Sequence, residues 1–183
     1  MQTQTKTHRT IRNLVFSALC LGLCLVLPFL TGQIPQVGTM LCPMHIPVLL
    51  SGFLCGPWWA MATGLAAPAL RFVLFSMPPP MPTGLAMTFE LAAYGLTAGL
   101  LYRIMPKNIP CIYASLIGAM LAGRIVWGIA CTVIYGTMGN AFTWPIFLAG
   151  AFFNAIPGII VHIILIPALV IALRTSKITD IES

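Results

Sequence analysis

Acidic residues are nearly missing from this chain: three Asp or Glu stand against nine Lys or Arg in 183 residues, and charged residues make up only 7%. A soluble globular chain carries roughly 25% charged residues, so this chain lacks the polar surface that water requires. That shortage excludes a soluble enzyme, a nucleic-acid-binding domain and a disordered chain. Hydrophobic residues make up 59% of the sequence, and the mean hydropathy is +0.98. The composition therefore indicates an integral membrane protein.

The motifs of common catalytic and metal sites are also missing. There is no Walker A motif, so we do not expect the chain to hydrolyse a nucleotide. Neither H-E-x-x-H nor G-x-S-x-G occurs, and Glu90 is the only acid within the apolar runs. The six cysteines form no C-x-x-C pair and are expected to behave as small hydrophobes. We predict that the chain is not an enzyme and holds neither a metal nor a cofactor.

Apolar runs separated by Gly, Pro and polar residues occupy most of the chain, and a membrane-spanning helix needs about 20 such residues. The second run contains Pro43 and Pro47 and is short, so we expect a kinked or partly interfacial helix there. The first run resembles a signal peptide, but no small-residue cleavage site follows it. We predict an all-α, six-helix integral membrane bundle that forms one domain over residues 1–183. The predicted helices span about 12–30, 41–55, 58–77, 83–103, 110–136 and 142–173.

Basic residues are distributed unevenly between the two ends of these helices. An even number of spans places both termini on one side, and seven Lys or Arg lie on that side. The three opposite connections, 31–40, 78–82 and 136–141, contain none. This asymmetry predicts cytoplasmic termini in a cell membrane of prokaryotic type. The seven residues are Lys6, Arg9, Arg12, Arg103, Lys107, Arg174 and Lys177.

Three charged residues lie inside apolar runs, where a charge is costly and marks a functional site by default. At 1.5 Å of rise per residue, Arg71 and Glu90 lie roughly 9 and 10 Å below the outer ends of their helices, and Arg124 roughly 17 Å below. His45 is about one turn from the same side, and Asn154 about 15 Å. We predict that these five residues line a polar chamber that opens outward.

The charges in this chamber allow two interpretations. Arg71 and Glu90 have similar depths on adjacent helices, so they either form a structural salt bridge or belong to the site. If Arg71 pairs with Glu90, no acid remains in the spans for Arg124, and a buried unpaired guanidinium is costly. Because guanidinium groups bind carboxylates bidentately, a small anionic solute is expected to complete the site. Trp127 and Trp144 lie nearby and are candidates for packing an organic solute. His45 and Asn154 also have purely structural interpretations, the second as an interhelical hydrogen-bonding group.

Small residues recur at a spacing of four, which lets helix backbones approach closely. Most such pairs are expected to pack inside the bundle. The pair formed by Ala18 and Gly22 lies on the first helix and is a candidate for contact with a second protein.

Three stretches resemble the substrate-binding S components of energy-coupling factor (ECF) vitamin transporters. They are MLCPMHIPVLLSGFLCGP (40–57), PALRFVLFSMPP (68–79) and AMTFELAAYG followed by GLLY (86–95 and 99–102). Within that family, the chain is most similar to the branch that includes pantothenate, folate and hydroxymethylpyrimidine transporters.

The resemblance implies a membrane subunit that captures a vitamin or vitamin precursor from outside. Uptake then requires a transmembrane coupling protein and two cytoplasmic ATPases. The ligand is expected in the outer half, between the fourth to sixth helices and under the connection after the first. It also implies that a small-xxx-small surface on the first helix contacts the coupling protein. Here the nearest match is Ala18-x-x-x-Gly22 rather than Ala-x-x-x-Ala.

Two other classes remain open at this point. A structural or assembly membrane protein without a solute ligand would pair its buried charges internally, and an ion or proton channel would carry polar residues along the full span. For a vitamin ligand, one net positive charge in the chamber favours a monoanion. Pantothenate, with its carboxylate and hydroxyls, fits that charge.

Overall fold

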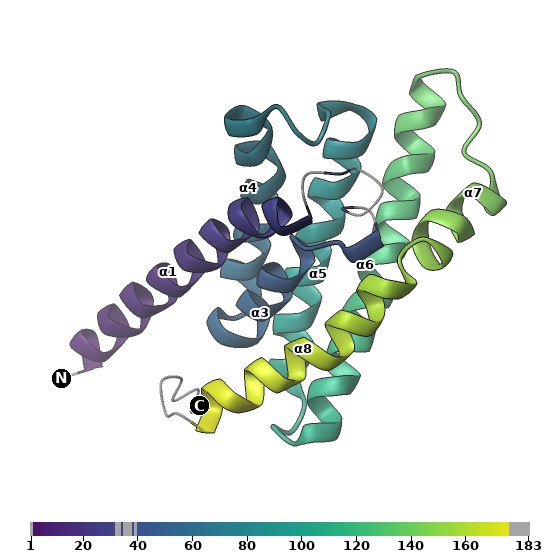
Figure 1. Ribbon diagram of the computed structural model, residues 1–183. Helices are drawn as coiled ribbons and strands as arrows, with labels where there is room; N and C mark the ends of the chain where they lie inside the picture. Colours follow the sequence, from purple (N-terminus) through teal and green to yellow (C-terminus); the bar gives the residue numbers. More distant parts are fainter. Residues whose placement is uncertain (1, 32–33, 35–37, 39, 176–183) are drawn as a thin grey trace.

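The computed structural model of the protein describes residues 2–31, 34, 38 and 40–175, and every regular element within them is helical (Figure 1). The predicted connection 31–40 lies partly, and Lys177 wholly, outside the described residues. The elements in chain order are α1 (Gln2–Val26), η1 (Leu27–Thr31), α3 (His45–Cys55), α4 (Pro57–Phe75), η2 (Pro80–Gly84), α5 (Leu85–Ile104), α6 (Ile109–Thr137), α7 (Trp144–Leu148), η3 (Ala149–Phe153) and α8 (Ile156–Thr175).

Five helical segments of the described chain are long and apolar enough to cross a membrane. The exception among the six main helices is α3, whose 11 residues extend only about 16 Å. All of its residues except Ile46 are buried, so α3 lies inside the bundle rather than at an interface. The all-helical membrane architecture predicted from composition is therefore confirmed, with a short internal helix in second place.

The helix ends follow the positions of proline and glycine. The first helix begins at Gln2, ten residues before its predicted start, because no Gly or Pro interrupts residues 2–21. It gives way to the 3-10 turn η1 at Pro28, whose ring prevents a further α-helical hydrogen bond. The last predicted helix, 142–173, is divided into α7, η3 and α8.

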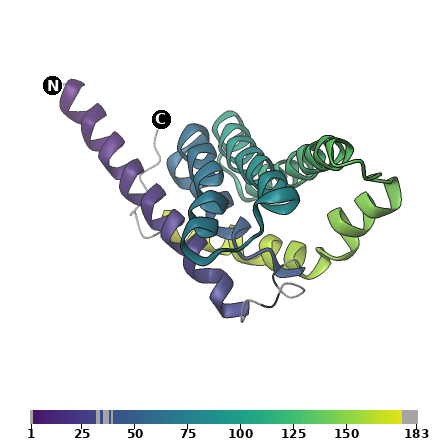
Figure 2. The same cartoon turned by 90° about the horizontal axis from the view of Figure 1, so that it is seen from above.

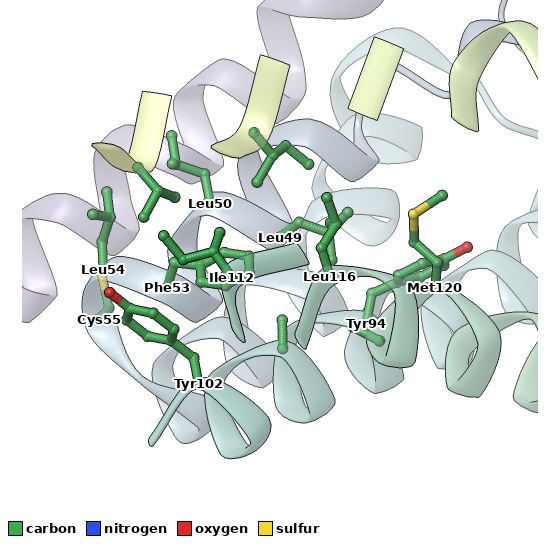
Figure 3. Close-up of a cluster of buried hydrophobic side chains, with 14 residues drawn as sticks. Leu49, Leu50, Phe53, Leu54, Cys55, Tyr94, Tyr102, Ile112, Leu116 and Met120 are labelled. Carbon is green, nitrogen blue, oxygen red and sulfur yellow. The ribbon is translucent and has the colours of Figure 1, made fainter. Parts of the chain in front are cut away.

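The core lies where α5 packs against α3, α4 and α6. Figure 3 shows its main hydrophobic cluster, which includes Leu49 and Phe53 of α3, Tyr94 of α5 and Leu116 of α6. At Gly64 of α4, an added Cβ would lie 2.5 Å from the carbonyl oxygen of Leu91. At Gly95 of α5, it would lie 2.6 Å from the carbonyl oxygen of Ala60. Glycine thus allows direct backbone contact between α4 and α5.

The two ends of the bundle carry different connections. The start of α1, the end of α8 and the turn between α5 and α6 lie at one end, and the α4–α5 and α6–α7 turns lie at the other (Figure 1). Viewed from above, α1 and α7 lie at opposite edges of the molecule (Figure 2). We call the end with the α4–α5 and α6–α7 turns the turn end.

Candidate functional site

A buried ion pair between α5 and α6 is the centre of the candidate site. Nη1 of Arg124 lies 2.9 Å from Oε1 of Glu90 and donates a hydrogen bond to it. His45, the first residue of α3, places its Nε2 3.4 Å from the same carboxylate oxygen. The three residues are 8%, 3% and 2% exposed, respectively. Three helices thus bring their polar side chains to one carboxylate in the interior.

Three further side chains surround this ion pair. The imidazoles of His45 and His162 lie nearly parallel, with 6.0 Å between their centroids, and the ring of Tyr94 meets His45 edge-on at 5.0 Å. Nη2 of Arg124 is 3.9 Å from the sulfur of Cys42. We call the set of Cys42, His45, Glu90, Tyr94, Arg124 and His162 the polar cluster.

Several nitrogen atoms of the polar cluster are buried without a hydrogen-bond partner among the described residues. They are Nε of Arg124, both ring nitrogens of His45 and Nε2 of His162. His45 Nε2 is close to Glu90, but the pair does not have hydrogen-bond geometry. A buried donor or acceptor left unpaired costs about 1–3 kcal/mol, so a single fold-stabilising network does not account for this arrangement. Groups of this kind are suited to binding a molecule that enters the cluster.

Arg71 lies in a different place from the one we predicted. Its Nη1 donates a 2.6 Å hydrogen bond to the carbonyl oxygen of Leu25, and its guanidinium carbon is 5.4 Å from the ring centroids of both Phe29 and Phe75. The Arg71–Glu90 salt bridge, one of our two interpretations, is therefore wrong. Helical rise gives depth but not rotation about the helix axis, and Arg71 faces α1 and η1. Arg124 has the acid instead, so the argument that a free Arg124 requires an anionic solute also fails.

Trp127 belongs to an aromatic cluster between α6 and α7. It lies 5.8 Å from Phe142 and 6.1 Å from Phe147 between ring centroids, and Trp144 stacks on Phe147 at 5.2 Å. Tyr135 also packs on Phe142, at 5.6 Å. Trp127 is one helical turn from Arg124 towards the turn end. The aromatic cluster therefore lies beyond the polar cluster along α6.

Two glycines receive the rings of the aromatic cluster. An added Cβ at Gly128 of α6 would lie 2.5 Å from the ring of Phe147, and one at Gly150 of η3 would lie 2.7 Å from the ring of Trp127. The glycines of the aromatic cluster thus contact side chains, whereas the glycines between α4 and α5 contact backbone atoms of the facing helix.

Trp144 and Asn154 are exposed, Trp144 at 69%. Within the described chain, no hydrogen bond or ion pair joins either one to Glu90 or Arg124. Their predicted contact with a solute remains a prediction. Cys42, Tyr94 and His162 cannot be assigned to the site from the sequence, because a lone Cys, Tyr or His in an apolar run has no distinguishing pattern.

Ala18 and Gly22 lie one turn apart on an exposed side of α1. No atom lies within 4 Å of where a Cβ on Gly22 would be. This side of α1 is therefore open to a neighbour, whereas Cys20 and Cys24 on the opposite side are buried.

The described residues contain no group of three or more His, Cys, Asp or Glu side chains arranged to hold a metal ion. The polar cluster is thus a set of hydrogen-bonding groups around one ion pair. A bundle of membrane-competent helices with such groups in its interior defines a multi-pass membrane protein with an internal polar cluster.

Comparison with known families identifies the family of membrane proteins to which the chain belongs. The family model "ECF transporter, substrate-specific component" matches residues 12–170, and the chain belongs to this family. Searches of curated proteins and of solved structures found no match. Membership makes the chain a transport subunit that works with a small-molecule substrate and with ECF transporter partners.

Proposed function

We propose that this protein captures a vitamin or vitamin precursor outside the cell and delivers it for ATP-driven uptake by an ECF-type importer. The family match over residues 12–170 carries the proposal. The family resemblance implies a transmembrane coupling protein and two cytoplasmic ATPases as partners, which agrees with the absence of a Walker A motif in the given sequence.

The proposed substrate site is the polar cluster, extended towards the turn end by Trp127. Glu90, Arg124 and His45 supply hydrogen-bonding groups in a dry interior, where they discriminate between solutes more strongly than in water. Trp144 and Asn154 lie further out and are proposed as peripheral contacts. Arg71 is not part of this site.

The proposed orientation has both termini in the cytoplasm and the turn end outside. Seven basic residues flank the spans on the side of the termini, and none occurs in the three opposite connections. Cysteine substitutions at Pro80 and Asn140 are expected to react with an impermeant thiol reagent added from outside. Labelling only from the cytoplasmic side would contradict this orientation.

The alternative is a structural membrane protein without a solute. The Arg124–Glu90 pair supports this alternative, because it neutralises two buried charges internally. The unpartnered nitrogens beside that pair oppose it, because a purely structural cluster is expected to satisfy its own polar groups.

Two measurements test the proposal. Mass spectrometry of small molecules released from the purified protein should identify an organic solute, and recovery of none across several growth media would favour the structural alternative. In liposomes, the protein alone should bind this solute but not accumulate it. Accumulation should appear only when the coupling protein, both ATPases and ATP are added. Accumulation by the isolated chain would contradict the proposed division of roles.

A further inference from the structure

The charges at the centre of the polar cluster cancel. Arg124 and Glu90 are in direct contact at 2.9 Å, and the other buried arginine, Arg71, is held by Leu25, Phe29 and Phe75. Glu90 is the only acid inside the spans. A carboxylate solute that approached Arg124 would come close to Glu90, and two like charges in a dry interior repel strongly.

The hydrogen-bonding capacity of the cluster is mixed. Nε of Arg124 is a donor only, whereas an uncharged imidazole presents one donor and one acceptor. These unpartnered nitrogens come from side chains that are more than nine-tenths buried, on α3, α6 and α8. A carboxylate only accepts hydrogen bonds, so it would leave the acceptor positions unpaired. A solute edge with both a donor and an acceptor matches the cluster.

We propose, resting on the proposed function, that the substrate is uncharged and presents a hydrogen-bond donor and an acceptor on one edge. A primary amide and an aminopyrimidine both have such an edge. The aromatic cluster begins one turn along α6 from Arg124 and supplies aromatic side chains beside the polar cluster, which suits a solute with a planar ring. The Arg124–Glu90 pair acts as a neutral element that excludes carboxylates.

The test uses pairs of probes in which an uncharged group replaces a carboxylate. Nicotinamide is compared with nicotinate, panthenol with pantothenate and biotinamide with biotin, with hydroxymethylpyrimidine as a further uncharged ring. Thermal stabilisation of the purified full chain in detergent, followed by titration of Trp fluorescence, gives the affinities. We expect at least one uncharged probe to bind. If that probe belongs to a pair, its carboxylate counterpart should bind at least about tenfold more weakly.

Tighter binding of a carboxylate than of its uncharged counterpart would overturn this inference and leave the proposed function standing. Binding of no probe, together with no solute released from the purified protein, would overturn both.

A variant that removes the charge of Glu90 tests the role of the ion pair directly. Glu90→Gln keeps the side-chain shape but leaves Arg124 without its counter-charge, so the preference should move towards carboxylates by about tenfold or more. Arg71→Gln is the matched control, because it removes a buried arginine outside the polar cluster and should leave the preference unchanged. An equal change in both variants would contradict a specific role for Glu90. Should Glu90→Gln fail to fold, the unmodified chain's charge preference still decides the matter.

Discussion

Two buried arginines in this protein are stabilised in different ways. Arg124, near the middle of α6, contacts the carboxylate of Glu90, and unpartnered nitrogens remain around it. Arg71, near the turn end of α4, donates to one carbonyl oxygen and lies against two phenylalanine rings. Both residues are less than a tenth exposed. Burial alone therefore does not distinguish an arginine beside unpartnered polar groups from one that joins two segments of the chain.

The difference lies in what surrounds each guanidinium. The contacts of Arg71 join α4 to the end of α1 and to η1, so this arginine fixes the start of the connection that leads to α3. The contacts of Arg124 join α6 to α5 and leave polar groups available nearby. Glu90, the single acid within the spans, thus pairs with Arg124, beside which buried nitrogens still lack hydrogen-bond partners.

Among these substitutions, removal of the Glu90 carboxylate should lower stability the most. Glu90→Ala leaves Arg124 buried without a counter-charge, and breaking a buried pair in this way costs about 3–5 kcal/mol. Thermal unfolding in detergent should show a large drop in the midpoint. The double variant Glu90→Leu with Arg124→Met should regain much of the lost stability, because it removes both charges. A double variant as unstable as Glu90→Ala would mean that the pair is not the reason for the loss.

Replacing the other arginine should cost less. Arg71→Met keeps much of the apolar volume but loses the hydrogen bond to Leu25 and both ring contacts, which together are worth about 2–3 kcal/mol. The same unfolding measurement applies. Arg71→Lys should recover part of the loss, because an ammonium group still donates to a carbonyl and interacts with a ring face. A loss of stability as large as that of Glu90→Ala would show that Arg71 makes a stronger interaction than its contacts with Leu25 and the two rings.

The two rings around Arg71 should have smaller, interdependent effects. Phe75→Leu should lower stability by about 1 kcal/mol through loss of the cation–π contact and of the edge-on contact with Phe29. In the Arg71→Met background the same substitution should cost less, since one of these contacts is already gone. Strict additivity in this double-mutant cycle would argue against an Arg71–Phe75 interaction.

A substitution on the outer side of α1 should have the smallest effect on stability. A Cβ at Gly22 would meet no neighbouring atom within 4 Å, so Gly22→Leu should not lower stability, and the higher helix propensity of leucine should raise it by less than about 1 kcal/mol. Solute binding should also be unchanged. ATP-driven uptake should fall, because a bulky residue prevents close approach of a partner helix. Normal uptake by Gly22→Leu in proteoliposomes would place the docking surface elsewhere.

The sequence allows prediction of the helices more directly than of their contacts. Long apolar runs with Pro and Gly between them indicate the helical architecture, and helical rise places Glu90, Arg124 and His45 at depths that allow them to meet. The same arithmetic pairs Arg71 with Glu90 wrongly, because each helix is free to rotate about its axis until packing fixes it. His162 joins the cluster because Gly158 of α8 lies close to Met40 and Leu41, a backbone approach that no local pattern reveals.

The aromatic cluster between α6 and α7 determines how easily the turn end of the bundle can change shape. Its rings lie against Gly128 and Gly150, so α7 can move away from α6 without separating the backbones of α4 and α5. Such movement breaks the contacts of Trp127 with Phe142 and Phe147, at about 1 kcal/mol for each aromatic pair. Separation also exposes the apolar area that these rings bury, which adds to this cost. We therefore expect α6 and α7 to separate more readily than α4 and α5, whose backbones are in direct contact.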